Sequence, residues 1–284
     1  MVAPILKHGP DLHQGQRLWL FAGTCDGPPL AKALLAQGWC VRVSLVSPQA
    51  ARAYSSLLEG VGPERLELHI GAISGAEMLV AQLALARAQA RPFAALIDAT
   101  HPFARVVSQT LAAGCQQAGL PLLRLQRPLV PLGEATVLPE LSALGHCDLV
   151  GERLLLALGA RQLAVAVASS AGALHHARLL PSAHALQQAL GLGLAPERIA
   201  CLQPSDDFAV EAALVRQWGI TAIVCRQSGG RTETGWRQVA ARQGCRLLLL
   251  ARPAEPGNSL AVLSPQALLA KLETLLPDAG VIQH

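Results

Sequence analysis

The sequence predicts an α/β protein of two domains, each built on a parallel sheet. Two observations indicate this fold class. Along most of the 284 residues, short apolar runs alternate with stretches in which apolar residues have the spacing of a helix. This alternation weakens once, near the middle of the chain. Strands that alternate with helices of about 10–15 residues form right-handed βαβ units, whose strands run parallel. The composition agrees, because 51% of the residues are hydrophobic and only 15% are charged.

The first domain is predicted over residues 17–128, after an N-terminal tail of residues 1–16. Its strands are short apolar runs, and its helices are the stretches in which apolar residues recur every three or four positions. The predicted strands are 17–22, 40–46, 65–70, 93–99 and 121–125. The predicted helices are 28–37, 48–58, 75–89 and 104–118, the first of which ends at Gly38, a typical residue after a helix.

The second domain is predicted over residues 152–284, after a crossover linker at 129–151. The linker is expected there because Pro131, Gly133 and Pro139 interrupt the alternation. Beyond it the predicted strands are 153–158, 176–180, 198–202, 221–225 and 246–251. A helical stretch is expected after Gly159, and further helices are predicted at 183–190, 207–218, 234–243 and 265–276.

Composition argues against several classes of protein. No apolar run approaches the roughly 20 residues that span a bilayer, and the first residues lack the apolar core of a signal peptide, so a cytoplasmic protein without membrane contact is expected. A net charge of +4 with dispersed arginines and 3% aromatic residues does not suit nucleic acid. The seven cysteines form no Cys-x-x-Cys pair, so no metal site is expected. The mild basic excess suits a small polyanionic ligand.

Polar residues gather where predicted strands end, the edge of an open parallel sheet at which ligands bind. The segment 23–27, GTCDG, follows the first strand and opens a helix. It is either a tight turn or a loop whose backbone N–H groups hold a phosphate. The second strand ends at Ser47, with Arg52 one turn into the next helix. A hydroxyl and a guanidinium at this position favour the ribose 2′-phosphate of NADPH over the free diol of NADH.

The fourth strand runs directly into DATHPF at 98–103. Pro102 disfavours the helical region at His101, so the histidine is expected to lie extended on the rim of the sheet. His101 is either a structural residue or a group that binds a carboxylate or delivers a proton. Asp98 is expected to reach the rim or to cap the following helix.

A second glycine-rich loop, RQSGG at 226–230, follows a strand of the second half. It is either a flexible loop or a clamp for phosphate or carboxylate, made from a hydroxyl, the backbone and an arginine.

Several of these segments together resemble the precorrin-6A reductase family of cobalamin biosynthesis. DATHPFA followed by Ser108 resembles the family's DATHPFA…S segment, and FAGTCDGPPLAKALLAQG resembles its N-terminal glycine loop and helix. PLLRLQRP, VCRQSGG and LLLLARP resemble later segments in the right order, so the resemblance runs from about Leu18 to Pro253. The sequence departs from the family pattern at Ala22, where the family has glycine, and at Arg226-Gln227, where it has lysine and an acid. The aromatic residue of the family's Pro-Phe-Ser is also missing at 203–205.

The resemblance implies two Rossmann-like domains with a cleft between them that holds cofactor and substrate. It implies reduction of one double bond of precorrin-6A or cobalt-precorrin-6A by NADPH or NADH, the substrate being a corrinoid tetrapyrrole rich in carboxylates. Catalytic roles are expected for His101 and Asp26. The expected cofactor-binding residues are Gly23, Thr24, Ser47, Arg52, Thr100, Ser228 and Gly229. The residues expected to bind anionic substrate groups are Arg127, Arg226 and Arg252.

Two other functions stay open at this point. One is a non-enzymatic, two-lobed protein that binds or senses an anionic metabolite. The other is an unrelated sugar-nucleotide or phosphotransfer enzyme on a similar fold, because a fold does not determine a function. The sequence also leaves open the cobalt content of the macrocycle, the choice of nicotinamide, the proton donor and the oligomeric state.

Overall fold

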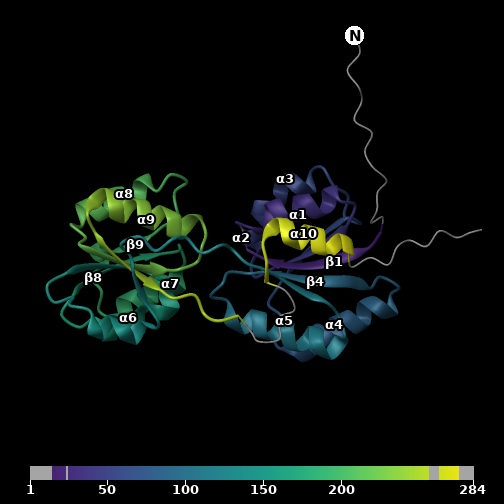
Figure 1. Cartoon of the computed structure of the whole chain (residues 1–284), viewed down its shortest axis with the longest axis horizontal. Helices are drawn as coiled ribbons and strands as arrows, with labels where there is room; N and C mark the ends of the chain where they lie inside the picture. The colour runs from purple at the N-terminus through teal and green to yellow at the C-terminus, as the bar shows by residue number, and fades with distance from the viewer. Residues whose placement is uncertain (1–14, 24, 256–261, 275–284) are drawn as a thin grey trace, which may run out of the picture. The chain divides into compact units, whose positions relative to one another are not determined.

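A computed structural model describes residues 15–23, 25–255 and 262–274 (Figure 1). It contains two six-stranded sheets, and every pairing between their described strands is parallel. The described residues divide into two compact units, the first made of those up to residue 126 and from residue 253 onward and the second of residues 127–252. The predicted fold class, two α/β domains with parallel sheets, is therefore confirmed. In the described part of the chain, no helix is long and apolar enough to cross a membrane.

The sheet of the first unit has the strand order β12-β5-β4-β1-β2-β3. Its strands are β1 (Arg17–Ala22), β2 (Cys40–Leu45), β3 (Leu66–Ile70), β4 (Phe93–Ala99), β5 (Leu122–Leu125) and β12 (Val262–Leu263). Its helices are α1 (Gly27–Ala36), α2 (Pro48–Ala51), the 3-10 helix η1 (Arg52–Tyr54), α3 (Ser55–Leu58), α4 (Ala76–Ala88), α5 (Arg105–Ala118) and α10 (Pro265–Thr274). The strand order reverses between β1 and β4, and such a switch point is where doubly wound sheets bind ligands.

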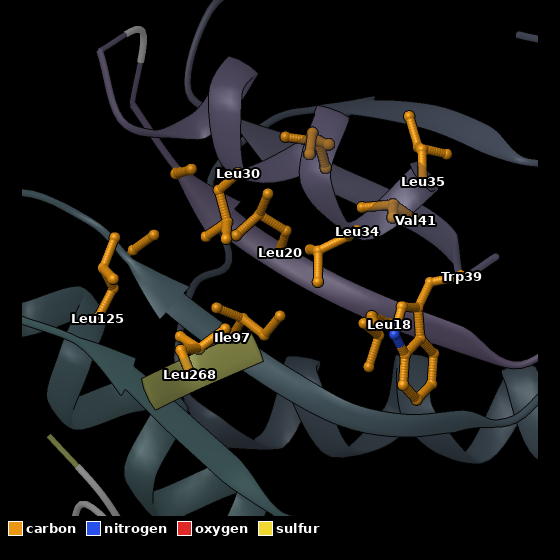
Figure 2. Packing of buried hydrophobic residues seen from close by; sticks show 14 of the residues in the cluster. Leu18, Leu20, Leu30, Leu34, Leu35, Trp39, Val41, Ile97, Leu125 and Leu268 are labelled. Atoms are coloured by element: carbon orange, nitrogen blue, oxygen red, sulfur yellow. The ribbon is translucent and has the colours of Figure 1, made fainter. Parts of the chain in front are cut away.

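Helices cover both faces of this first sheet, with α1 and α10 on one face and α4 and α5 on the other (Figure 1). Successive residues of a strand point to opposite faces, and the fully buried β1 supplies both cores. Leu18 and Leu20 lie in one cluster with Leu268 of α10 (Figure 2). Trp19 and Phe21 lie in the other cluster, with residues of α4 and α5.

Five strands of the second sheet repeat this topology within the order β6-β11-β10-β7-β8-β9, with the switch point between β7 and β10, while the outermost β6 comes first in the chain rather than last. Its strands are β6 (Thr136–Leu138), β7 (Arg153–Ala157), β8 (Leu174–Leu179), β9 (Ile199–Cys201), β10 (Ala222–Arg226) and β11 (Arg246–Leu250). Its helices are η2 (Leu141–His146), η3 (Ala160–Gln162), α6 (Leu163–Ser169), α7 (Ala183–Gly191), η4 (Pro196–Arg198), α8 (Ala209–Gln217) and α9 (Arg231–Gln243). Within this unit α8 and α9 cover one face, and α6 and α7 cover the other (Figure 1).

One outer strand of each sheet, β12 or β6, lies outside the domain limits expected from the sequence. β12, expected within a second domain of residues 152–284, pairs with β5 and brings α10 onto the first sheet, where Leu268 and Leu272 are buried. β6, expected within a linker at 129–151, pairs with β11 in the second sheet. β12 has two residues and β6 has three, so both are too short to show an alternating pattern. Long-range pairing rather than local sequence determines where they belong.

Candidate active site

The loops after β1 and β4 lie side by side at the switch point of the first sheet, because Ala22 pairs with Ala99. Gly23 is exposed, and a Cβ built on it would meet no atom within 4 Å. Thr24, expected to bind the cofactor, lies outside the described residues. This edge of the sheet therefore offers an open glycine loop next to the segment that carries His101.

The buried side chain of Tyr54 supports the glycine loop at 23–27 from the core side. The predicted helix 48–58 is present but not continuous, because the 3-10 helix η1 breaks it between α2 and α3. At the break Tyr54 turns into the core, where it is fully buried, and its hydroxyl donates to the Gly23 carbonyl at 3.0 Å. A side chain at Gly27 would collide with this hydroxyl. Burial raises the pKa of Tyr54, and the negative charge of Asp26 raises it further, so the hydroxyl stays a neutral donor.

Asp26 precedes α1 as its N-cap residue, but its side chain makes no capping hydrogen bond. Pro28 and Pro29 follow within the first turn of α1, and proline has no N–H to donate. The N–H of Leu30 is already bonded to the Asp26 carbonyl at 3.2 Å. A pyrophosphate at this edge would therefore be held by the backbone of the loop rather than by the first turn of the helix.

Ser47 and Arg52 lie beyond the carboxyl end of β2. The Ser47 oxygen accepts a hydrogen bond from the Ala50 N–H at 3.3 Å as the N-cap of α2, which leaves its hydroxyl hydrogen as a donor. Arg52 is exposed and makes no ion pair with any residue that the structure describes. The pair fits an anionic group such as a ribose 2′-phosphate.

Asp98 is almost completely buried, and its partner is Arg124, not the helix that follows. The Asp98 Oδ1 and Arg124 Nη1 atoms lie 2.7 Å apart, and the two residues are register partners in β4 and β5. The helix α5 begins at Arg105 without a side-chain cap, so the capping role expected for Asp98 is wrong. Asp98 Oδ1 also accepts hydrogen bonds from the N–H and the hydroxyl of Thr100 at 2.9 and 2.7 Å.

His101 is half-buried on the segment between β4 and α5. Its Nδ1 accepts a hydrogen bond from the Phe103 N–H at 3.2 Å, and the two rings lie 5.8 Å apart. The neutral imidazole in this arrangement carries its hydrogen on Nε2. Protonation of the ring would place a hydrogen on Nδ1, against the Phe103 N–H. The geometry therefore favours a hydrogen-bond donor over an imidazolium acid.

The glycine-rich loop of the second unit is packed against arginines. Gly229 has a φ of +66°, and a side chain there would collide with the Pro128 carbonyl and the Arg252 guanidinium. A Cβ on Gly230 would lie 2.6 Å from Arg127 Nη1. Arg252 Nη1 donates to the Arg127 carbonyl at 2.7 Å. Two of the three arginines expected to bind substrate are thus gathered at this loop.

Arg226, the third arginine, ends β10 beside Gly159, which follows β7 across the second switch point. Its Nε donates to Gln162 Oε1 at 2.9 Å. Burial lowers the pKa of Arg226, and the positive charge of Arg161 lowers it further. The carboxyl edge of the second sheet therefore concentrates positive charge, as the sites of polycarboxylates do. We refer to Arg127, Arg161, Arg226 and Arg252 as the arginine cluster.

Ser228, expected to bind the cofactor, is only 3% exposed. The next residue of the loop, Gly229, is bound by Glu233 of α9, which was not predicted from the sequence. Its Oε2 accepts a hydrogen bond from the Gly229 N–H at 2.7 Å, and its Oε1 accepts one from Arg237 Nε at 2.8 Å. Glu233 directly precedes the predicted helix 234–243, which carries Arg237, so their spacing of four residues was a signal that could have found the pair. Nothing local in the sequence could have indicated Tyr54 or the role of Arg124.

No group of three or more metal-ligating side chains occurs among the residues that the structure describes.

Comparisons with known proteins point to one family. A family model described as precorrin-6x reductase CbiJ/CobK matches residues 17–273. The cobalt-precorrin-6A reductase of Synechocystis sp. is 32% identical over 242 residues, which cover 83% of this chain and 88% of that protein. The precorrin-6A reductase of Mycobacterium tuberculosis is 32% identical over 250 residues, 87% of this chain and 93% of that protein. A solved structure of CobK precorrin-6A reductase matches with a TM-score of 0.68 and 25% identity, and covers 92% of this chain and 97% of that one.

Proposed function

This chain belongs to the precorrin-6x reductase family, and we propose on that premise that its first unit holds NADPH and its second unit holds the carboxylates of the macrocycle. The chain is an oxidoreductase of cobalamin biosynthesis that acts on a carbon–carbon double bond of its substrate. Membership in a reductase family disfavours the non-enzymatic binder. It likewise disfavours an unrelated sugar-nucleotide or phosphotransfer enzyme.

The arginine cluster is the observation that carries the substrate assignment. Precorrin-6A bears several acetate and propionate groups, and a planar guanidinium binds a carboxylate through two parallel hydrogen bonds. Arg127, Arg226 and Arg252 are proposed to bind these groups. Gly229 and Gly230 allow Arg252 and Arg127 to approach the loop closely, and any side chain at these positions would displace them.

The cofactor assignment rests on the open loop at Gly23 and on the exposed Arg52. The loop backbone between Gly23 and Gly27 is proposed to hold the pyrophosphate, and Ser47 with Arg52 the 2′-phosphate. NADPH supplies the hydride when bound. Asp26 lies in the same loop, and its catalytic role remains a prediction. Thr24, Ser228 and Gly229 likewise remain predictions, as cofactor ligands.

His101 is proposed to act on the macrocycle as a hydrogen-bond donor through Nε2, which orients the substrate or stabilises charge that develops in the ring system. The contact between Nδ1 and the Phe103 N–H supports this role, because it fixes both the ring and its tautomer. Delivery of the accompanying proton by His101 is the second possibility, and it requires that contact to break.

Steady-state turnover tests the proposal directly. The purified chain is supplied with precorrin-6A or cobalt-precorrin-6A, each with NADPH or NADH, and absorbance at the nicotinamide band is followed. We expect kcat/KM to be higher with NADPH and the preference to shrink in Arg52→Ala. Equal or better use of NADH by the unaltered chain would overturn the assignment of the 2′-phosphate. The same measurements decide which macrocycle is the substrate.

A further inference from the structure

A buried ion pair between Asp98 and Arg124 contacts the segment that carries His101. Asp98 at the end of β4 is 1% exposed and Arg124 of β5 is 2% exposed. Both are charged groups taken out of water, yet a buried ion pair contributes little net stability compared with apolar residues of the same size. The pair is therefore poorly explained as a stabilising feature of the sheet, and its further contacts show what it holds.

Those contacts converge on Thr100, the residue before His101. Arg124 Nη1 donates to both the carbonyl and the hydroxyl oxygen of Thr100 at 3.2 Å. Asp98 accepts from the N–H and the hydroxyl of the same residue. The backbone N–H, the backbone carbonyl and the hydroxyl of Thr100 are thus all hydrogen-bonded to the ion pair. The hydroxyl hydrogen of Thr100 is engaged by Asp98, so Thr100 is better suited to holding the loop than to donating to a cofactor.

His101 is held from the other side by the two residues that precede α5, Phe103 and Ala104. The Ala104 N–H donates to the His101 carbonyl at 2.7 Å, and the Phe103 N–H binds the ring. Pro102 restricts the backbone between these contacts. The ion pair thus fixes the chain before the histidine, and the first residues toward α5 fix the chain after it.

We propose that Arg124 is a positioning residue for His101, acting through Thr100 and Asp98. The inference rests on the proposed function, in which His101 contacts the macrocycle. The guanidinium is fixed at a second point, because Arg124 Nε binds Glu255 Oε2 at 3.1 Å. A lysine would keep the charge but could not bind Asp98, Thr100 and Glu255 at once. A small displacement of a reacting group costs up to about a hundredfold in rate, so loss of this geometry reaches the chemical step.

Arg124→Lys is the test variant and Arg17→Lys is its matched control. Arg17 is also a buried arginine on a strand of the first sheet, with Nη2 at 2.9 Å from Glu67 and Nη1 at 2.7 Å from the Arg91 carbonyl. It lies at the opposite end of β1, away from the loop of His101. We expect both variants to lose a similar amount of thermal stability. Arg124→Lys should lower kcat by about tenfold to a hundredfold, with NADPH affinity unchanged, whereas Arg17→Lys should keep kcat within about twofold.

A double-mutant cycle with His101→Ala distinguishes positioning from general destabilisation. Residues that act as one unit show non-additive losses, so Arg124→Lys should lower kcat little further once His101 is removed. Additive losses, or an unchanged kcat in Arg124→Lys alone, would overturn the proposal. If Arg124→Lys does not fold, Asp98→Asn takes its place in the same cycle, since it keeps the size of the side chain and removes the ion pair. Full turnover by His101→Ala alone would instead refute the role of His101 in the proposed function.

Discussion

The carboxyl edges of the two sheets share one topology, but different chemistry holds their loops in place. In the first unit the anchor lies within the sheet, where Asp98 and Arg124 on neighbouring strands bind the backbone and the side chain of Thr100. In the second unit the anchor is Glu233 on the helix that follows the loop; it binds the backbone N–H of Gly229 in the loop and pairs with Arg237 of its own helix. The first arrangement fixes one side chain at the edge. The second leaves the arginine cluster beside the loop, where it gathers positive charge.

The largest expected effect concerns the first unit. His101→Ala should lower kcat/KM by about 10²–10³-fold, the loss that follows removal of one preorganised hydrogen-bond donor, while the melting temperature and NADPH affinity stay nearly unchanged. The physical reason is that His101 is only half-buried, and the bond from the Ala104 N–H to the His101 carbonyl does not need the ring; of these two bonds to His101, only the one from the Phe103 N–H is lost.

His101→Gln separates the two roles of the side chain, because glutamine donates a hydrogen bond but does not titrate. Substantial activity in His101→Gln is expected for a hydrogen-bond donor. Full turnover in His101→Ala, together with a lower melting temperature, would show that the histidine is structural and that the comparison of the two edges has no catalytic meaning.

The anchor of the second unit predicts a different kinetic signature. Glu233→Gln leaves Arg237 without its carboxylate, and breaking a buried pair costs about 3–5 kcal/mol of folding stability. Because the loop of Gly229 loosens beside the arginine cluster, KM for the macrocycle should rise about tenfold while kcat changes less.

Glu211→Gln is the matched control for this variant. Glu211 is fully buried in the same unit, pairs with Arg178, and holds Ser205 at the end of a more distant strand. It should cost similar stability without changing KM for the macrocycle. A fall in kcat alone for Glu233→Gln would contradict the proposal that the edge of the second sheet binds the substrate while the edge of the first supports the chemical step.

Mild acid should reveal a second difference between the units. Burial lowers the pKa of His176 on β8 to about 4, from 6.5 for an exposed histidine, and nearby positive groups add to the effect. Between about pH 4 and pH 6.5, His176 is therefore protonated in the unfolded chain but neutral in the folded chain. The stability associated with neutral His176 is fully present above pH 6.5 and is lost as the pH falls toward 4, by about 2 kcal/mol at pH 5.

Chemical unfolding at pH 7.5 and pH 5, followed by tryptophan fluorescence, measures this loss. Trp218 lies 5.1 Å from the His176 ring and reports on this unit. His176→Gln should be less stable than the unaltered chain at pH 7.5 but should lose less stability on acidification. An equal loss in both proteins would assign the acid sensitivity elsewhere.

The sequence predicts ten of the twelve described strands but misses β6 and β12, for a physical reason. β1 and β4 match the predicted ranges 17–22 and 93–99 because a strand buried on both faces is a continuous apolar run. β6 and β12 carry no such run, since they are short strands at the margin of each sheet. Their membership depends on pairing with β11 and β5, which are distant in sequence.

The candidate site shows the same limit. The glycine loops and His101 are visible in the sequence because turn residues follow apolar runs at one edge of a sheet. The pairing of Asp98 with Arg124 is not visible, because it depends on the register of β4 against β5. Tyr54 is hidden for a related reason: it sits in a segment with helical spacing, and only the tertiary fold brings its hydroxyl to the Gly23 carbonyl.

The central claim, that the first unit holds the cofactor and the second holds the substrate carboxylates, is tested most directly by titrating NADPH into two variants. Nicotinamide fluorescence gives Kd for Gly23→Val, which adds a side chain where the structure leaves open space, and for Arg226→Gln, which removes one charge of the arginine cluster. We predict that Gly23→Val weakens NADPH binding by at least about tenfold, or 1.4 kcal/mol, and that Arg226→Gln leaves it unchanged. Weaker binding in Arg226→Gln with unchanged binding in Gly23→Val would contradict the account.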